Sequence, residues 1–219
     1  MDRLKQLRGK LTDRKERRDR NRARYRRTGK GGREARKHQK AVLKLRRLIT
    51  KIKRQPRSTS PAGVTFIKTF EGFSPRPVNI GDGVLTWGYG HTAPLGSKGP
   101  SSITEPQAAQ LLAKDLARTY EPAVNALFAK NGPLYGRFAP WRYDCLVSVA
   151  YNLGTGALLP YPHPGFETLG RAIQSGSLKA IAAALPLYSN PGSIFHEGLL
   201  RRRKAEARLF LTGNYSTEV

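Results

Sequence analysis

The sequence predicts an α+β protein, in which a small hairpin sheet precedes a mainly helical lobe and a basic arm precedes both. Residues 73–92 are rich in Gly, Pro and β-forming side chains, a composition typical of irregular hairpin strands. Amphipathic stretches of helical period follow, without an internal repeat. The charge is uneven, because residues 1–57 hold 25 Lys and Arg against 5 Asp and Glu, whereas residues 58–219 hold 15 against 10. The net charge of +25 is therefore mainly a property of the arm.

The arm, residues 1–57, contains two segments of helical period separated by a glycine-rich break at 28–32. In the second segment apolar residues recur at steps of three, four and three, at Val42, Leu45, Ile49 and Ile52. In the first segment the spacing is similar, at Leu4, Leu7 and Leu11. The pattern favours a helical hairpin, and the alternative is an arm that stays disordered until it binds. Pro and Ser then predict a linker at 58–61, followed by a domain at 62–219.

Within the domain, a short helix is expected from 62 to 70, ending at Glu71. Thr104 suits the cap of a second helix with Pro106 in its first turn, and the apolar pattern predicts that this helix continues to 128. A deeply buried helix is expected over 140–151. Three further helices complete the lobe, at 166–174, 178–185 and 198–211. The one cysteine, Cys145, lies in an apolar run and is expected to be a buried core residue.

A carboxyl group and a hydroxyl flank the predicted hairpin, because Glu71 stands fifteen positions before Thr86. Cleavage of a glycosidic bond needs an acid that protonates the leaving oxygen, and a second group that stabilises the transition state or activates water. Glu71 is placed for the first role. Taken alone, however, Glu71 is better interpreted as a solvated or helix-capping glutamate.

From Phe70 onward the chain resembles the phage-type lysozymes, glycoside hydrolase family 24, which include many endolysins. Several separate motifs carry the resemblance in order: Glu71-Gly72, the run from Thr86 to Thr92 (TWGYGHT), the helix start at Thr104 (TEPQA), the run from Tyr143 to Gly154 and the run from Gly198 to Phe210. The resemblance implies a lysozyme-like fold and a muramidase, which cleaves the β-1,4 bond between N-acetylmuramic acid and N-acetylglucosamine in bacterial peptidoglycan. It implies neither a metal nor an organic cofactor.

The resemblance also implies roles for single residues. Glu71 would be the general acid and Thr86 would hold the attacking water. Arg202 would pair with Glu71, while Tyr151 and Thr168 would line the cleft and contact sugar. The alternatives are a surface charge for Arg202, core packing for Tyr151 and a helix cap for Thr168.

One position departs from the family pattern, which has Asp or Cys between the glutamate and the threonine. Here that position is Ile80, which can neither take a proton nor orient water. Asp82 lies two residues later, on the same side of an ideal strand and between two glycines, so we expect it to supply the second carboxylate. The alternative is that Asp82 is only a turn residue. Asn79 is a weaker substitute, able to orient water but not to act as a base.

The arm predicts a polyanionic partner. We rank an anionic cell-wall polymer or membrane surface first, ahead of nucleic acid, because Tyr25 is the arm's one aromatic residue and stacking on bases has little support. A docking segment for another protein is a third reading. The leading function is a monomeric phage endolysin that lyses the host cell; the alternative is a non-catalytic wall- or nucleic-acid-binding protein on a lysozyme scaffold. The start lacks the apolar core of a signal peptide, so we expect the host cytoplasm before lysis and the wall after membrane permeabilisation.

Overall fold

The computed structural model describes residues 2–28, 32–53, 56–79, 83–130, 139–159 and 164–218. The chain divides into two compact units, Met1–Gln55 and Pro56–Val219. Among the described residues, no helix has the length and apolar character that crossing a membrane requires.

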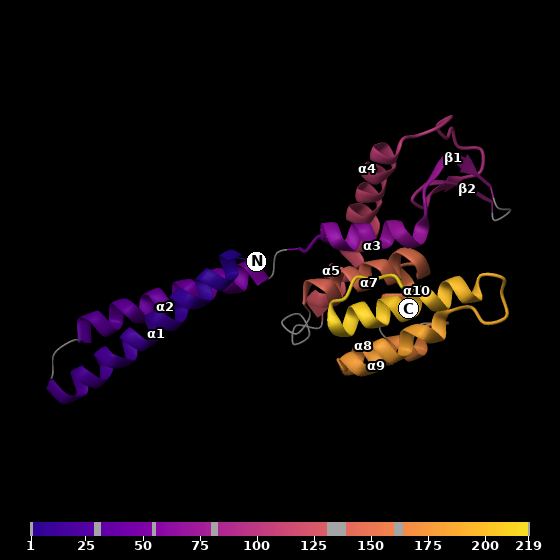
Figure 1. Ribbon diagram of the computed structural model, residues 1–219. Helices are drawn as coiled ribbons and strands as arrows, with labels where there is room; N and C mark the ends of the chain where they lie inside the picture. Colours follow the sequence, from indigo (N-terminus) through magenta and orange to yellow (C-terminus); the bar gives the residue numbers. More distant parts are fainter. Residues whose placement is uncertain are drawn as a thin grey trace. The chain divides into compact units, whose positions relative to one another are not determined.

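The first unit consists of two helices, α1 (Asp2–Thr28) and α2 (Gly32–Lys53), which lie side by side (Figure 1). Apolar side chains at seven-residue spacing on α2 are buried, with Ala35, Val42 and Ile49 exposed by 6%, 0% and 8%. Leu7 of α1 is also buried. The apolar stripe predicted for this segment is therefore used in packing. The side chains of Leu4 and Ile52 lie outside the described part of the chain.

The second unit holds a small sheet and a helical lobe, as the α+β prediction requires (Figure 1). Its elements are, in order, α3 (Pro61–Glu71), β1 (Ser74–Val78), β2 (Val84–Gly88), β3 (His91–Pro94), α4 (Glu105–Asp115), η1 (Leu116–Tyr120), α5 (Glu121–Lys130), α7 (Pro140–Leu153), η2 (Thr155–Leu158), α8 (Glu167–Ser175), α9 (Leu178–Ala184), η3 (Leu185–Tyr188) and α10 (His196–Thr212).

Helix α3 has clear start and stop signals. The side chain of Ser60 accepts a hydrogen bond from the backbone N–H of Gly63, and Pro61 occupies the first turn, where its missing N–H costs nothing. The helix ends at Glu71 because Gly72 follows with φ at +67°, a conformation that turns the chain into β1. This end places the glutamate at the junction of helix and sheet.

The segment before α3 is held against the helical lobe. The backbone N–H of Arg57 donates to Asn125 Oδ1 at 2.8 Å, and that of Thr59 donates to a carboxylate oxygen of Glu121 at 2.7 Å. Ser60 donates to buried Asp144 through its backbone N–H at 3.0 Å. Residues 58–60, expected to be linker, are thus fixed to α5 and α7.

The sheet has the order β1-β2-β3, and both pairings are antiparallel. Thr86 in the middle of β2 lies opposite Val78 of β1 and Thr92 of β3. The β1–β2 register shifts between Ser74 and Val78, which marks a bulge or irregularity in β1. This irregularity agrees with the irregular hairpin strands expected for this stretch.

The predicted continuous helix over 107–128 is wrong in one respect, because a π-helical turn, η1, separates α4 from α5. Here the backbone N–H of Glu121 donates to the carbonyl of Leu116, five residues back. The next residue, Pro122, has no N–H to donate, so the regular ladder cannot run through this point. Pro122 supplies the physical reason for the wider turn.

The core surrounds α7, whose residues from Tyr143 to Ala150 are all buried. Helices α3, α5 and α10 pack against it. Cys145 is 0% exposed and its Sγ lies 3.2 Å from the carbonyl oxygen of Glu206, so the expectation of a buried cysteine is confirmed. Burial raises the pKa of its thiol well above the ordinary value.

Candidate active site

Glu71 projects from the last turn of α3 and meets Arg202 of α10. Arg202 Nη1 donates to Glu71 Oε1 at 2.6 Å, and the two side chains are 4% and 17% exposed. A charged hydrogen bond of this length between poorly exposed groups fixes the orientation of the carboxyl group. Arg202, a residue of the helical lobe, therefore holds one oxygen of Glu71 in place.

The other oxygen faces the turn between β2 and β3. Gly90 has φ at +90°, and a Cβ atom placed on it would lie 3.1 Å from Glu71 Oε2 and 3.1 Å from Tyr151 Oη. Tyr151 Oη donates to the backbone carbonyl of Tyr89 at 2.6 Å. Tyr151 therefore links the turn to α7. At position 90 only glycine avoids a close contact with the carboxyl group of Glu71.

Two tyrosines lie near the glutamate. The rings of Tyr120, from the π-helical turn, and Tyr151 have centroids 4.8 Å apart. Burial, followed by the charges of Glu71 and Asp115, raises the pKa of the Tyr151 hydroxyl, and burial with the same two carboxylates raises that of Tyr120. Both hydroxyls therefore remain neutral hydrogen-bonding groups at ordinary pH.

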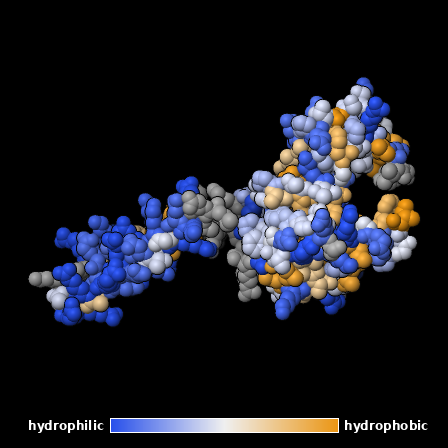
Figure 2. All heavy atoms as spheres, in the orientation of Figure 1, coloured by the Kyte–Doolittle hydropathy of each residue, from blue (hydrophilic) through white to orange (hydrophobic). Residues whose placement is uncertain are grey.

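Glu71 opens into a cavity of about 340 Å³ at the junction of α3, α7 and α10. Its lining combines charge, an amide and apolar side chains: Phe70, Glu71, Asn152, Ile194, Phe195, Gly198, Leu199, Arg201 and Arg202. Ile194 is 93% exposed and Phe195 is 61% exposed, in the loop before α10. Figure 2 shows hydrophobic atoms gathered where this loop reaches the surface. The combination is that of a cleft for a ligand with both polar and apolar faces.

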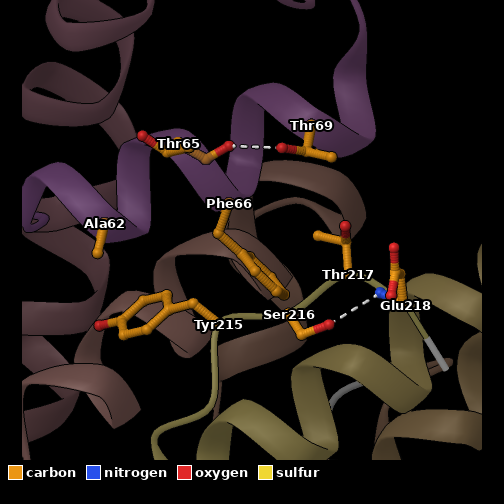
Figure 3. Close-up of a pocket in the computed structure, with 8 residues that line it drawn as sticks. All are labelled: Ala62, Thr65, Phe66, Thr69, Tyr215, Ser216, Thr217 and Glu218. Atoms are coloured by element: carbon orange, nitrogen blue, oxygen red, sulfur yellow. Dashed lines mark hydrogen bonds between the residues drawn. The ribbon is translucent and has the colours of Figure 1, made fainter.

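A second cavity, of about 460 Å³, lies between α3 and the C-terminal segment (Figure 3). Thr65 and Thr69 on its wall donate their hydroxyl protons to carbonyls of their own helix, at 3.1 and 3.0 Å. No charged pair comparable to Glu71 and Arg202 is present among its described lining residues. We therefore place the candidate active site at Glu71.

The remaining candidates are spread differently. Thr86 is half-buried in β2, and Thr168 is exposed in the first turn of α8. Of the residues that the structure describes, neither one lines the cavity around Glu71. Ile80 and Asp82 lie outside the described residues, so the position of the second carboxylate stays a prediction. Asn79, just after β1, is described and exposed.

His91 starts β3. Its Nδ1 lies 2.7 Å from Asp115 Oδ2 at the end of α4, which links the sheet to the helix that follows it. Across the described ranges, His, Cys, Asp and Glu side chains form no group of three that could hold a metal ion.

Sequence reasoning missed a set of buried polar groups beneath Glu71. Arg203 and Glu206 are 0% exposed, and Glu206 receives a hydrogen bond from Ser148 at 2.7 Å. A signal was present, because residues 202, 203, 206, 209 and 210 occupy one helical face and the last two are apolar. Charged residues at the phase of an apolar stripe indicate a buried ionic cluster.

Comparison with known proteins shows the family of the chain. Residues 68–206 match the sequence model of the family described as phage lysozyme. The chain belongs to the phage lysozyme family. It is 30% identical, over 70% of its length, to an endolysin of Bacillus phage B103, and 30% identical to an endolysin of Salmonella phage P22, again over 70% of its length and 97% of that protein.

Solved structures of a muramidase domain and of an endolysin share the fold. The muramidase domain of SpmX from Asticaccaulis excentricus is 30% identical with a TM-score of 0.55, over 71% of this chain and 99% of that one. The endolysin from Escherichia coli O157:H7 phage FAHEc1 is 26% identical with a TM-score of 0.57, over 74% and 98%. The expected lysozyme-like α+β fold is confirmed, and family membership implies a hydrolase of the glycosidase class.

The match stops short of the whole length of some relatives. The chain spans 54% of the Bacillus phage B103 endolysin and 59% of an endolysin of Lactococcus phage c2. The matched region corresponds to the second unit, and the first unit precedes it.

Proposed function

We propose that the second unit is a muramidase that hydrolyses the β-1,4 bond between N-acetylmuramic acid and N-acetylglucosamine, and that the protein acts as a phage endolysin. The observation that carries the proposal is the placement of Glu71, whose carboxyl group is fixed by Arg202 while opening into a cavity. The family supplies the reaction class. An acid held at the wall of such a cleft suits proton transfer to a bound glycan.

In the proposed reaction Glu71 gives its proton to the glycosidic oxygen as the bond from that oxygen to the anomeric carbon breaks. Water adds its oxygen to the anomeric carbon and loses one proton to a base, for which Asp82 is the candidate. Thr86 would hold the water through its hydroxyl group. Tyr151 would shape the cleft through its hydrogen bond to the backbone carbonyl of Tyr89. Thr168 would contact the sugar at the edge of the cleft.

The test is release of reducing ends from purified peptidoglycan by wild-type protein and by variants. Glu71→Gln should abolish cleavage, because the amide has no proton to give, and Asp82→Asn should lower it strongly. Glu218→Gln, a glutamate in the second cavity (Figure 3), is the matched control and should keep wild-type turnover. Full turnover in Asp82→Asn would make Asp82 a turn residue. Binding without reducing ends in the wild type would favour the alternative, a non-catalytic scaffold protein.

For the first unit we propose electrostatic binding to an anionic cell-wall polymer. The support is that the buried stripe of α2 leaves mainly charged side chains outside, and Figure 2 shows hydrophilic residues over both helices on the face in view. Contact through charge predicts binding that weakens as salt rises. Because the apolar stripe of α2 is buried by packing, it offers little apolar surface to a membrane. A membrane partner is therefore less well supported than a wall polymer.

Removal of residues 1–55 tests this role and leaves Arg57 with its partner Asn125. The truncated protein should bind whole walls more weakly at low salt, yet cleave soluble glycan fragments at the wild-type rate. Equal wall binding with and without the arm rules the role out, and tighter binding to DNA than to wall polymer would assign the arm to nucleic acid. We further propose that the protein waits in the host cytoplasm and reaches the wall after the membrane is permeabilised.

A further inference from the structure

Beneath the cavity, three side chains of α10 form one ionic cluster with Glu71. Glu206 Oε1 accepts hydrogen bonds from Arg202 Nε at 3.2 Å and from Arg203 Nη2 at 3.1 Å. Arg203 Nε lies 3.0 Å from Glu206 Oε2. Arg202 then extends to Glu71 at 2.6 Å. A single buried carboxylate, Glu206, thus holds both guanidinium groups.

The charges of this cluster balance only when Glu71 is counted. Arg202, Arg203 and Glu206 are 3%, 0% and 0% exposed, and together they carry one surplus positive charge. Burial of an uncompensated charge is costly, so the surplus favours the carboxylate form of Glu71 and opposes the protonated form that the proposed reaction needs. The state of the acid at the cleft is therefore coupled to a carboxylate that never reaches the cleft.

We propose that Glu206 is a positioning residue of the active site: it anchors Arg202 for its contact with Glu71 and sets the charge against which Glu71 holds its proton. The inference rests on the proposed muramidase function. Glu206 has no route to the substrate, because it is 0% exposed and its neighbours include Ser148 of α7. Its effect on the reaction must pass through Arg202.

The titration of the arginines agrees with this balance. Burial lowers the pKa of Arg203, against the opposing effect of Glu206. For Arg202 burial also acts downward, but Glu206 and Glu71 together outweigh it and raise the pKa. Arg202 is therefore the better compensated of the two, as expected for the residue that contacts both carboxylates.

The other charged or titratable groups around Glu71 are left unchanged in these experiments, and they include Arg201, which lines the same cavity. Tyr151 of α7 and Tyr120 of the π-helical turn face it, and the pKa of each is raised. Beyond them lies Asp115 of α4, paired with His91 of β3 at 2.7 Å. None of the variants below removes any of these groups.

The experiment compares pH–rate profiles on purified peptidoglycan for three variants whose cluster charges differ. Glu206→Gln removes one negative charge, so the net charge of the cluster rises by one and favours the carboxylate form of Glu71. The alkaline limb of the pH–rate profile should therefore move to lower pH by roughly one unit. Arg203→Met removes one positive charge and should move the limb to higher pH by a similar amount. The double variant restores the balance and should return the limb to the wild-type position. In Glu206→Gln kcat should fall about tenfold with little change in KM, because substrate contacts are untouched.

Glu197→Gln removes the same charge from the exposed face of α10 and is the matched control, expected to leave the profile unchanged. If the variants lose activity in proportion at every pH, without limb shifts of opposite sign, Glu206 is a structural residue only and the proposal is overturned. Where Glu206→Gln does not fold, Arg203→Met and the charge-balanced double variant give the same decision. Inactive wild-type protein would instead refute the proposed function.

Discussion

Replacement of Gly90 by alanine should lower the catalytic rate through a direct contact with Glu71, in addition to its effect on the stability of the fold. The new Cβ would stand 3.1 Å from Glu71 Oε2, closer than an ordinary van der Waals contact. Glu71 cannot simply turn away, because Arg202 holds its other oxygen at 2.6 Å. A displacement of a few tenths of an ångström at a reacting group is enough to lower the rate, so kcat/KM should fall about tenfold, equivalent to ~1.4 kcal/mol.

A second glycine separates this crowding from backbone strain. Gly96 has φ at +92°, close to the +90° of Gly90, but a Cβ atom there would meet nothing within 4 Å. Each alanine variant should lose about 1–2 kcal/mol of unfolding free energy, because an L residue is strained at such φ values. The melting temperature should then fall by about 2–4 °C per kcal/mol in both.

The assay is release of reducing ends, measured well below the melting temperature of either variant. Gly96→Ala should keep wild-type kcat/KM while Gly90→Ala loses it. Equal losses in the two variants would show that backbone strain alone accounts for the effect. An active Gly90→Ala would show that Glu71 does not act where the structure puts it.

Three predictions concern the support of the fold. Asp144 is 1% exposed and accepts hydrogen bonds from the backbone and hydroxyl of Ser60 and from the hydroxyl of Tyr215, so Asp144→Asn should cost roughly 2 kcal/mol of unfolding free energy in a urea titration; an unchanged midpoint would contradict this. Burial, then the hydrogen bond to Asp144, raises the pKa of Tyr215 to about 12, so its contribution to stability is complete below about pH 10, the unfolded value, and is lost as pH rises through 12. Tyr215→Phe should lack that part of the alkaline decline, and an identical decline in both proteins would refute the assignment. Cys145, 0% exposed and with its thiol pKa raised by burial, should react with an aromatic disulfide reagent only as fast as the protein unfolds, and rapid labelling of native protein would be inconsistent with that burial.

Much of the second unit follows from local sequence signals. The cap at Ser60, the capping box at Thr104 and the glycine at 72 each act on the nearest backbone groups, so the ends of α3 and the start of α4 can be predicted from sequence. The π-helical turn was missed because the apolar period continues through 107–128, and only Pro122 indicates the break. A proline inside an apolar helical pattern marks a point where the regular hydrogen-bond ladder is interrupted.

The arm shows a different limit. Period alone predicts the apolar face of α2, but it does not say whether another helix or a surface covers that face. In the structure it is covered from α1, with Val42 at 0% exposure. His38 lies in the same packed face, where its Nδ1 is 3.1 Å from Arg14 Nη1. Packing between segments separated by a glycine break has no local signal.

The active site divides in the same way. Glu71 and its pairing with Arg202 were reached through resemblance to a family, because a run of four cations, residues 201–204, does not by itself single out one member. Helix phase separates them: Arg202 and Arg203 are buried, whereas Arg201 and Lys204 are exposed. Side-chain geometry is needed to show that Glu206 joins the two buried cations.

The ionic cluster on α10 contributes little to the stability of the fold. Taking two guanidinium groups and a carboxylate out of water costs more than well-packed apolar side chains would, and such clusters are weak sources of stability. Arg203 adds to the cost, since its Nη1 is buried without a hydrogen-bond partner among the described residues. An apolar α10 would serve the core equally well, but it would leave Glu71 unheld at the wall of the cavity. The position of the charges directly beneath the acid therefore accounts for their burial better than the needs of the fold do.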